Sequence, residues 1–315
     1  MYFPVLDHGF VSLVDYMGSD EDVERAARVS YGYGTRRTSE TRGLIRYLRR
    51  HRHTTPSEMV EVKFHCAMPI FVARQWIRHR TANLNEYSGR YSLLPLIFYS
   101  PEREQMKAQS ATNRQGREGE ALTALYDDAI ARWEQLRREA ATQYEWLVSH
   151  NVARELARID LPLSTYTQWY WKIDLHNLLH FLAVRADPHA QYEIRAFARI
   201  MAGMVKRVAP LSFEAWLDYQ IHGSVLSRGE LAALRRLVRV EDGRIRAQAD
   251  AQGRPIVLSP DDLKGVGLAP REVDEFIAKL ERIEVEDFEL DMTQARPPEH
   301  FARLMEAAVP RVDRG

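Results

Sequence analysis

Cysteine is nearly absent from this sequence, which has one, Cys66, in 315 residues. A single cysteine excludes an intrachain disulfide framework and a zinc site built from several cysteines. The sequence also lacks an apolar run of about eighteen residues, the minimum for a membrane-spanning helix, and a basic-then-apolar leader at MYFPVLDHGF. These absences predict a cytoplasmic protein with neither a membrane span nor a signal peptide.

An excess of either charge is absent as well, because Lys+Arg and Asp+Glu number 44 each. A chain without net charge has no overall field that would hold nucleic acid or an anionic membrane surface. Any basic site must therefore be local. Hydrophobic residues make up 45% of the chain, which is enough to build a sizeable core at this length.

Strand and helix signals succeed one another in the first 80 residues. GFVSLVDYMGS predicts a short strand, and SDEDVERAARVS predicts a helix capped by Ser19. TSETRGLIRYLRRH predicts a second helix, which ends before Pro56. MVEVKFHCAM alternates apolar and polar residues, which predicts a half-buried strand. A short helix in PIFVARQWIRHR then carries Gln75 and Arg78 to the start of a loop.

Helix signals dominate the middle of the chain. A long amphipathic helix is predicted from about Glu118 to Ser149, and VARELARIDLP predicts a short one after it. The stretch TYTQWYWKIDLHNLLHFLAVR is apolar almost all round, which predicts a helix buried between other helices. Asp187 and Pro188 then predict the start of a further helix, as its cap and its first residue.

The composition of the sequence and its secondary-structure signals change after about Val225. LSRGELAALRRLV carries a capping box from Ser227 to Glu230, and APREVDEFIAKLERI has apolar residues at helical spacing. Residues 241–262 between them are polar and Gly-rich. We therefore predict one domain at 1–225 and an appended helical extension at 226–315, which carries no recognisable chemistry.

Residues 78–91 read RHRTANLNEYSGRY and concentrate hydrogen-bond donors in what we predict to be an ordered loop. Guanidinium groups bind phosphate through two N–H donors at once, and turn amides add further donors. Only Glu86 is available to neutralise Arg78, Arg80 and Arg90 within the loop. An anion-binding site is therefore favoured over a solvated loop with surface ion pairs.

Arg78-His79-Arg80, seven further residues and then Ser88 form the pattern RHR-x7-S. With this pattern, and with NEYSGRY around it, the sequence resembles the flavin-dependent thymidylate synthases. The resemblance extends through HRHTTPSE, FVARQW, ARIDLP and RADPHAQYEI in matching order, and it covers roughly residues 5–225.

The resemblance implies an α+β protomer, a mixed α/β fold with an antiparallel sheet and several long helices, followed by the helical extension. It also implies a homotetramer in which several chains build each active site. The implied enzyme is a methyltransferase that binds FAD, takes electrons from NADPH and methylates dUMP to dTMP. Its carbon donor is a folate, 5,10-methylenetetrahydrofolate.

The resemblance further assigns residues to the two main ligands by position. Arg185 is expected to face the pyrimidine as the catalytic residue, because a fixed cation stabilises negative charge that develops on the ring. The expected dUMP-binding residues are Gln75, Arg78, Glu86, Ser88, Gly89, Arg90, Arg158 and Arg185. The expected FAD-binding residues are His53, Thr55, Arg78, His79, Arg80, Glu86, Asp174, His176 and His180.

Two parts of this assignment depart from the family pattern. Asn83 stands where the longer pattern usually has serine, and its amide can still donate and accept hydrogen bonds. The family also varies at the flavin-side positions that Asp174, His176 and His180 occupy in this chain.

Other roles are open for several of these residues. His53 and His79 could be capping or surface histidines. The spacing of HRH and RHR also resembles that of metal ligands. We predict no metal site, because no carboxylate or cysteine partner lies nearby in the sequence. Arg185 could pair with Asp187 at a helix start. Ser88 would need an adjacent base to act as a nucleophile, so phosphate binding is favoured.

Two other functions are compatible with the motifs. RHR, RRHRH and interleaved Tyr and Trp are typical of a nucleic-acid-binding module, which the zero net charge disfavours. A nucleotide-binding protein without turnover is the other, and dUMP-dependent consumption of NADPH would distinguish the enzyme from it.

Overall fold

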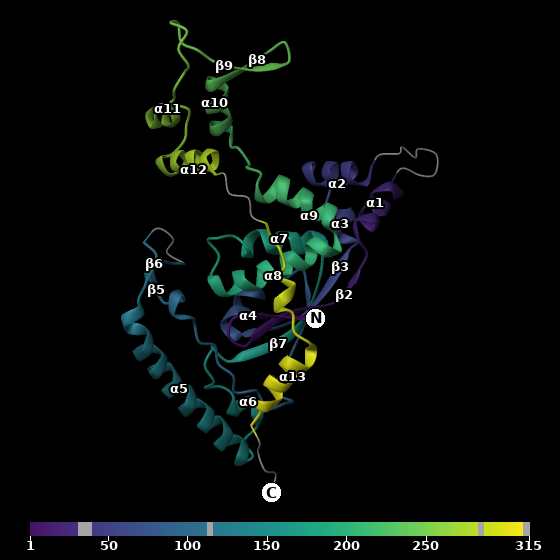
Figure 1. The fold of residues 1–315 in the computed structure, drawn as a ribbon, viewed down its shortest axis with the longest axis vertical. Helices are drawn as coiled ribbons and strands as arrows, with labels where there is room; N and C mark the ends of the chain where they lie inside the picture. Colours follow the sequence, from purple (N-terminus) through teal and green to yellow (C-terminus); the bar gives the residue numbers. More distant parts are fainter. Residues whose placement is uncertain (31–39, 112–115, 283–286, 311–315) are drawn as a thin grey trace. The chain divides into compact units, whose positions relative to one another are not determined.

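The computed structural model describes residues 1–30, 40–111, 116–282 and 287–310. They form two compact units, one of Met1–Trp216 with Phe288–Gly315 and one of Leu217–Asp287. The first unit contains the largest sheet and every residue to which the sequence assigns a role (Figure 1). The site is therefore described within this unit.

A five-stranded sheet forms the centre of the first unit. Its strands, in spatial order, are β1 (Tyr2–Val5), β2 (Gly9–Met17), β3 (Glu61–Pro69), β7 (Tyr166–Asp174) and β4 (Asn83–Glu86). Every neighbouring pair is antiparallel. The sheet and its helices confirm the predicted α+β class and the two predicted strands.

The alternation in β3 determines which of its side chains enter the core. Val62, Phe64 and Cys66 are fully buried, whereas the side chains between them are partly exposed. Successive residues of a strand point to opposite faces, so the alternating sequence buries one face of the sheet. This is the arrangement that the sequence predicts.

β7 corrects the prediction of one buried helix over residues 165–185. Tyr166–Asp174 form a central strand, and the helix α7 comprises only Leu175–Arg185. Aromatic and β-branched residues favour strands, but apolar side chains occur on both faces of β7, as exposed Tyr170 beside buried Trp171 shows. The alternation of apolar and polar residues that marks a strand was therefore not evident in the sequence.

Two smaller elements also differ from the prediction. Residues 83–86, expected in a loop, form β4 at the edge of the sheet. The helix α8 (Tyr192–Val208) begins after Gln191, so the start predicted at Asp187 and Pro188 is wrong. The Asp187 carboxylate instead accepts a hydrogen bond from the His189 amide at 2.8 Å, within the turn that precedes α8.

Several helices surround the sheet, and three of them confirm helices predicted from the sequence, namely α1 (Asp20–Val29), α2 (Thr41–Arg50) and α4 (Ile70–Trp76). Ser19 caps α1, because its hydroxyl accepts a hydrogen bond from the Glu21 amide at 3.3 Å. Residues 31–39, which include the first two of the second predicted helix, lie outside the described residues. The remaining helices near the sheet are α3 (Thr55–Glu58) and α9 (Pro210–Trp216).

The long predicted helix is present as α5 (Thr123–Ser149), but its start at about Glu118 is wrong, because Arg117–Ala121 form β6, which pairs with β5 (Lys107–Gln109) in a hairpin. Its apolar residues are not covered by the described part of the chain, because Leu125 and Leu136 are 56% and 63% exposed. Among the residues of α5 only Tyr144 is buried. Shorter helices flank it on either side, namely η1 (Arg103–Gln105) and α6 (Arg154–Ala157).

The second unit has a small core of its own. Its helices are α10 (Arg228–Leu237), α11 (Pro260–Gly265) and α12 (Pro270–Glu281). The capping box predicted from Ser227 to Glu230 is confirmed. A hairpin of β8 (Val238–Glu241) and β9 (Arg244–Ala247) follows α10. A short π-helical segment, η2 (Leu217–Ile221), begins the unit.

The C-terminal strap, residues 288–308, packs with the first unit. Phe288 lies against Trp216 with ring centroids 5.8 Å apart. Gly203 of α8 lies so close to the strap that an added Cβ would be 3.0 Å from Cβ of Leu290. The last part of the extension expected at 226–315 therefore packs with the first unit and does not form a separate C-terminal body.

The end of the strap extends the sheet and its hydrophobic cluster through η3 (Met292–Gln294) and α13 (Pro298–Ala307). Arg296 and Tyr2 exchange two backbone hydrogen bonds of 3.0 and 2.8 Å. Phe301 is 5% exposed, and its ring lies 4.8 Å from that of Phe10. The Ala308 carbonyl accepts a hydrogen bond from the Leu96 amide at 2.9 Å. The strap thus ties β1 to the segment that follows the RHR-x7-S motif.

We expect Phe301→Ala to destabilise the first unit by about 3–5 kcal/mol, because it leaves a cavity beside Phe10 and Tyr2. Chemical unfolding monitored by circular dichroism measures this difference. Arg303→Ala, an exposed change on the same helix, is the matched control and should stay within about 0.5 kcal/mol of the parent. Equal stability of the two variants would contradict the packing role of the strap.

Candidate active site

The RHR motif begins directly after α4, whose end is fixed in an aromatic cluster. Trp76 is fully buried and stacks on Phe181 of α7 with ring centroids 5.1 Å apart. The His79 amide donates to the Trp76 carbonyl at 3.0 Å. Arg78 and Arg80 on either side of His79 are exposed. The motif therefore presents two solvent-facing guanidinium groups around one half-buried imidazole.

His79 and Arg185, 106 positions apart, are hydrogen-bonded to each other. The Arg185 Nε–H donates to His79 Nε2 at 2.9 Å. An arginine N–H can only donate, so Nε2 of His79 must carry no proton and the ring must be neutral. Arg185 is the last residue of α7. The alternative of an ion pair between Arg185 and Asp187 at a helix start does not match this geometry.

The surroundings of His79 oppose its protonation. Burial, the positive charge of Arg185 and the nearby His180 lower the pKa of His79 from 6.5 to about 4. The folded state therefore binds this proton less readily than the unfolded state does. The stability contributed by neutral His79 is complete above pH 6.5 and is lost as the pH falls toward 4.

Most of the other residues expected beside the flavin lie at the starts of α7 and α3, whereas His180 lies in the middle of α7 with its ring centroid 6.2 Å from that of His79. Asp174 caps α7, since its carboxylate accepts from the amide and side chain of Asn177 at 2.9 and 2.7 Å. His176 lies in the first turn, and its Nδ1 atom is buried without a hydrogen-bond partner. His53 is exposed and precedes Thr55, the first residue of α3.

A second group of expected residues forms around the Ser88 turn. The Ser88 hydroxyl accepts from the Arg90 amide at 3.2 Å, and Arg90 Nε donates to Glu155 of α6 at 3.1 Å. A Cβ on Gly89 would lie 3.2 Å from Cδ of Arg158, so a larger residue there would require this side chain to shift slightly. The turn therefore holds two arginines beside one serine hydroxyl, with no histidine in contact that could activate it as a nucleophile.

Gln75 and Glu86 complete the set of expected substrate residues. Glu86 lies on β4, and its carboxylate accepts from the Thr167 hydroxyl of β7 at 2.7 Å. The Oε1 atom of Gln75 on α4 is buried and has no hydrogen-bond partner. A buried amide oxygen without a partner is costly, so this atom is suited to a ligand that donates to it.

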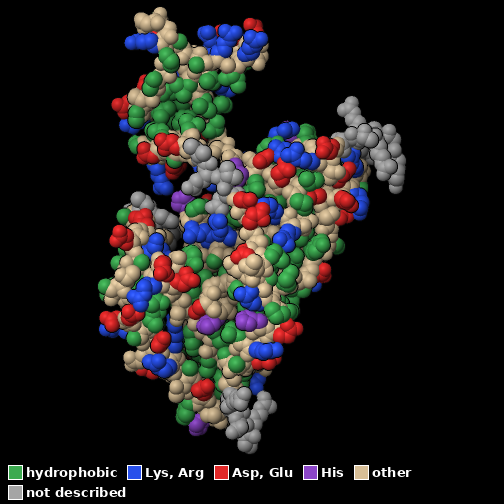
Figure 2. Space-filling view, in the orientation of Figure 1, with side chains coloured by type: hydrophobic (Ala, Val, Ile, Leu, Met, Phe, Trp, Pro, Cys, Tyr) green, Lys and Arg blue, Asp and Glu red, His purple; other side chains and the backbone are tan. Residues whose placement is uncertain are grey.

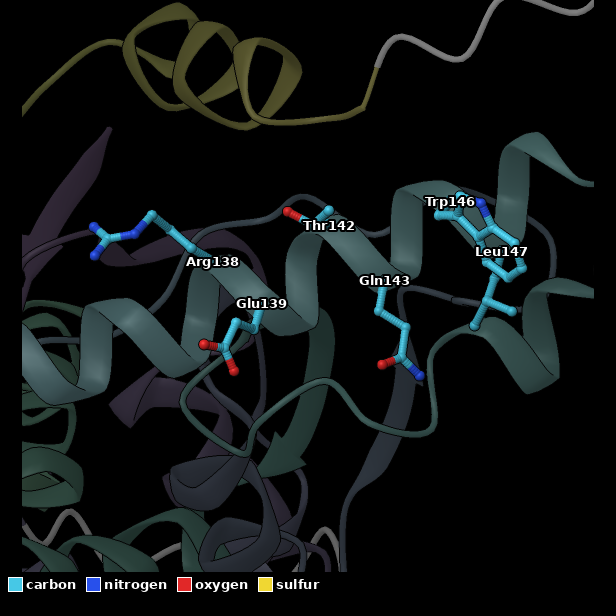
Figure 3. Close-up of a pocket in the computed structure, with 6 residues that line it drawn as sticks. All are labelled: Arg138, Glu139, Thr142, Gln143, Trp146 and Leu147. Carbon is cyan, nitrogen blue, oxygen red and sulfur yellow. The ribbon is translucent and has the colours of Figure 1, made fainter.

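The two hollows identified on the first unit lie away from these residues. One, of about 620 Å³, runs along α5 and is lined by residues of that helix alone, among them Trp146 and Gln143 (Figure 3). The other, of about 390 Å³, lies beside buried Glu193, which pairs with Arg117 at 2.9 Å. The expected site residues therefore form two surface groups and do not line either hollow.

The surface shows no segregation of charge on the visible face. Figure 2 shows Lys and Arg side chains interspersed with Asp and Glu. Within the described ranges, no group of three His, Cys, Asp or Glu residues could hold a metal ion. No described helix is long and apolar enough to cross a membrane.

The family model described as thymidylate synthase complementing protein matches residues 12–211. The chain belongs to the flavin-dependent thymidylate synthase family. A flavin-dependent thymidylate synthase from Gluconobacter oxydans is 58% identical over 240 residues, which cover 74% of this chain and 78% of that one. The enzyme of the same name from Wolbachia pipientis is 52% identical over 247 residues, covering 76% and 84%.

Solved structures support the same relationship. A UMP/dUMP methylase, PolB from Streptomyces cacaoi bound with 5-Br UMP, superposes with a TM-score of 0.63 at 33% identity. The match covers 69% of this chain and 97% of that one. These matches confirm the resemblance to the flavin-dependent thymidylate synthases that the RHR-x7-S pattern indicated.

The structure shows contacts of the expected site residues that the sequence analysis does not predict. Glu155 precedes Arg158 by three positions in RELAR, a spacing that places both on one side of a helical turn and could have indicated its role. Thr167 is 81 positions from Glu86, and no local signal links them.

We expect Cys66→Ala to keep most of the thymidylate synthase activity and to cost about 1 kcal/mol of stability at most. Cys66 is fully buried, and burial raises the pKa of its thiol, so no reachable thiolate forms. Initial rates and thiol-reagent labelling of the folded protein measure this. A folded, flavin-loaded and inactive variant would show that sulfur activates the pyrimidine.

We expect Arg185→Met to raise the pKa of His79 from about 4 toward 6.5, because it removes the positive charge beside the ring. An NMR titration of the labelled histidines measures the shift. His180→Asn is the comparison, and its effect should be smaller, since His180 contributes less than Arg185 does. An unchanged His79 titration in Arg185→Met would mean that burial alone sets the protonation state.

Proposed function

We propose that this chain catalyses the reductive methylation of dUMP to dTMP, with 5,10-methylenetetrahydrofolate as carbon donor and FAD and NADPH as the source of electrons. The observation that supports it most directly is Arg185, a half-buried cation whose hydrogen bond goes to a neutral histidine. No described carboxylate pairs with Arg185, so its charge remains available to a ligand. Membership of the family gives that ligand its identity.

The residues on the flavin side fit the cofactor chemically. Arg78 and Arg80 are exposed guanidinium groups, and buried His176 Nδ1 has no partner in the protein. A dinucleotide supplies acceptors for such donors through its phosphates and ring carbonyls. When bound, FAD would supply the electron transfer that the amino acids cannot perform.

Arg185 would stabilise the charge that develops on the pyrimidine. Burial lowers the pKa of Arg185, but a guanidinium remains protonated near neutral pH. Its Nε–H is held by His79, which fixes the direction of the other N–H donors. A cation held in this way needs no reorganisation when negative charge appears on the ring.

The Ser88 turn would bind the phosphate of dUMP. Arg90 and Arg158 both lie at the turn, and Glu155 holds Arg90 in place at 3.1 Å. Two guanidinium groups with one nearby carboxylate leave a net positive charge that suits a phosphate. Arg78, Glu86 and Gln75 would contact the rest of the nucleotide.

We further propose that the active protein is a homotetramer with active sites shared between chains. Two features support this: the expected residues form two separate groups within one chain, and α5 exposes Leu125, Trp133 and Leu136. A helix with exposed apolar residues is favoured to pack against another surface. The cytoplasmic location expected from the sequence remains part of this proposal.

We expect Arg185→Ala to lower dTMP formation about 100- to 1000-fold while FAD remains bound, because it removes a preorganised charge and leaves the other cofactor donors in place. Product formation and the flavin absorbance spectrum are measured on the same preparation. Arg207→Ala, an exposed change at the end of α8, is the control and should keep the parental rate.

Near-normal dTMP formation by Arg185→Ala would reject its catalytic role. A folded parent protein that carries no flavin, does not respond to added FAD and does not consume NADPH with dUMP would reject the proposed function as a whole.

A further inference from the structure

Thr167 is a buried residue whose hydroxyl reaches a residue of the expected site. It lies on β7 and is 4% exposed. Its hydroxyl donates a hydrogen bond of 2.7 Å to Oε1 of Glu86. A buried hydroxyl needs a partner, but a backbone carbonyl meets that need equally well, as the Pro162 carbonyl does for the buried hydroxyl of Thr165 at 2.7 Å. The choice of a carboxylate therefore points to a role beyond satisfying the hydroxyl.

The position of the Thr167 hydroxyl is fixed by the sheet. β7 lies between β3 and β4, and Thr167 is opposite Met68 of β3, which has no exposed surface. Glu86 is opposite Trp169, two positions along β7 from Thr167, so the side chains of Glu86 and Thr167 lie on one face of the sheet. A β-branched side chain is also stiff about χ1. The hydroxyl is thus a rigid donor anchored in the core.

Glu86, by contrast, has little else to hold its side chain. It is the exposed last residue of β4, an edge strand that pairs with β7 alone. Among the residues that the structure describes, Thr167 is the one donor to its carboxylate, and no ion pair to it is found there. A long glutamate side chain has considerable rotamer freedom. The Thr167 hydroxyl therefore selects where the Glu86 carboxylate lies.

The contact also distinguishes the two carboxylate oxygens of Glu86. Oε1 accepts from Thr167, whereas no described residue donates to Oε2. An ionised carboxylate is an acceptor only, so Oε2 suits a ligand group that donates, such as a hydroxyl. Holding the carboxylate before the ligand arrives reduces the entropy that is lost on binding.

We propose that Thr167 is a positioning residue, which holds Oε1 of Glu86 so that Oε2 accepts a hydrogen bond from a nucleotide hydroxyl. The identity of the ligand rests on the proposed function, in which Glu86 contacts dUMP and FAD. Both ligands carry hydroxyl groups, dUMP on its deoxyribose and FAD on its ribityl and ribose groups. Thr167 itself touches neither ligand and acts through Glu86.

A purely structural role for Thr167 leads to different behaviour. If its hydroxyl only joins β4 to β7, Thr167→Val should lower stability and leave the folded protein with normal ligand affinity. Thr165→Val is the matched control, because it removes another fully buried hydroxyl whose hydrogen bond goes to a backbone carbonyl. This control should bind dUMP and FAD like the parent.

The test measures binding to the flavin-loaded full chain. Calorimetric titration gives the affinity for dUMP, and flavin fluorescence on dilution gives the affinity for FAD. We expect Thr167→Val to weaken at least one of these ligands about tenfold, since a hydrogen bond to a charged group is lost. Thr167→Ser keeps the hydroxyl and should bind like the parent. The ligand that is weakened is the one whose hydroxyl meets Oε2.

A second comparison asks whether Thr167 acts through Glu86. In a Glu86→Ala background, Thr167→Val should cause no further loss of affinity, because the group that it positions is gone. A further loss in that background would overturn the proposal. Unchanged affinity of folded Thr167→Val for both ligands would overturn it as well. Thr167→Ala takes the place of Thr167→Val in these measurements should the latter not fold.

Failure of the proposed function is recognised separately. If the parent binds neither dUMP nor FAD, that function is wrong, and the hold of Thr167 on Glu86 is then tested by chemical unfolding. The effects of Thr167→Val and Glu86→Ala on the unfolding equilibrium constant should be non-additive by about tenfold. Additive effects would overturn the positioning of Glu86 by Thr167.

Discussion

The pairing of β3 with β7 is the constraint on which the active-site geometry depends. The two strands pair over nine residues in an antiparallel register, so α4 leaves β3 and α7 leaves β7 at opposite ends of the pair. The two helices nevertheless meet, because Trp76 stacks on Phe181 with ring centroids 5.1 Å apart. The next turns of chain carry His79 and Arg185 into contact. A shift of one residue in this register would turn the buried side chains to the opposite face and separate the pair.

Positive charges that the protein does not neutralise are the common feature of the site. Arg185 donates to a neutral histidine, and partly buried Arg158 forms no ion pair with any described residue. Such cations destabilise the chain by itself and are compensated when anionic ligands bind. The equal numbers of acidic and basic residues conceal this, because the imbalance is confined to a few positions.

Local patterns predicted the parts of the fold that depend on neighbouring residues. The alternation in β3 and the capping serines at 19 and 227 were read correctly, since each involves residues within a few positions. β7 was misread because Tyr166 and Tyr170 place aromatic side chains on the same face as Gln168 and Lys172, which interrupts the alternation of polar and apolar residues. The packing of Phe301 against Phe10 could not be predicted, because nothing near residue 301 indicates a contact almost a whole chain away.

The sequence by itself determined the family and the chemical types in the site, because RHR-x7-S places arginines, a histidine and a serine at fixed intervals along one segment. Only the tertiary structure decided which of these groups are charged and which are paired. The neutral state of His79 comes from burial and from an arginine 106 positions away. Desolvation and charge proximity depend on distances in space, and the linear order of residues does not contain those distances.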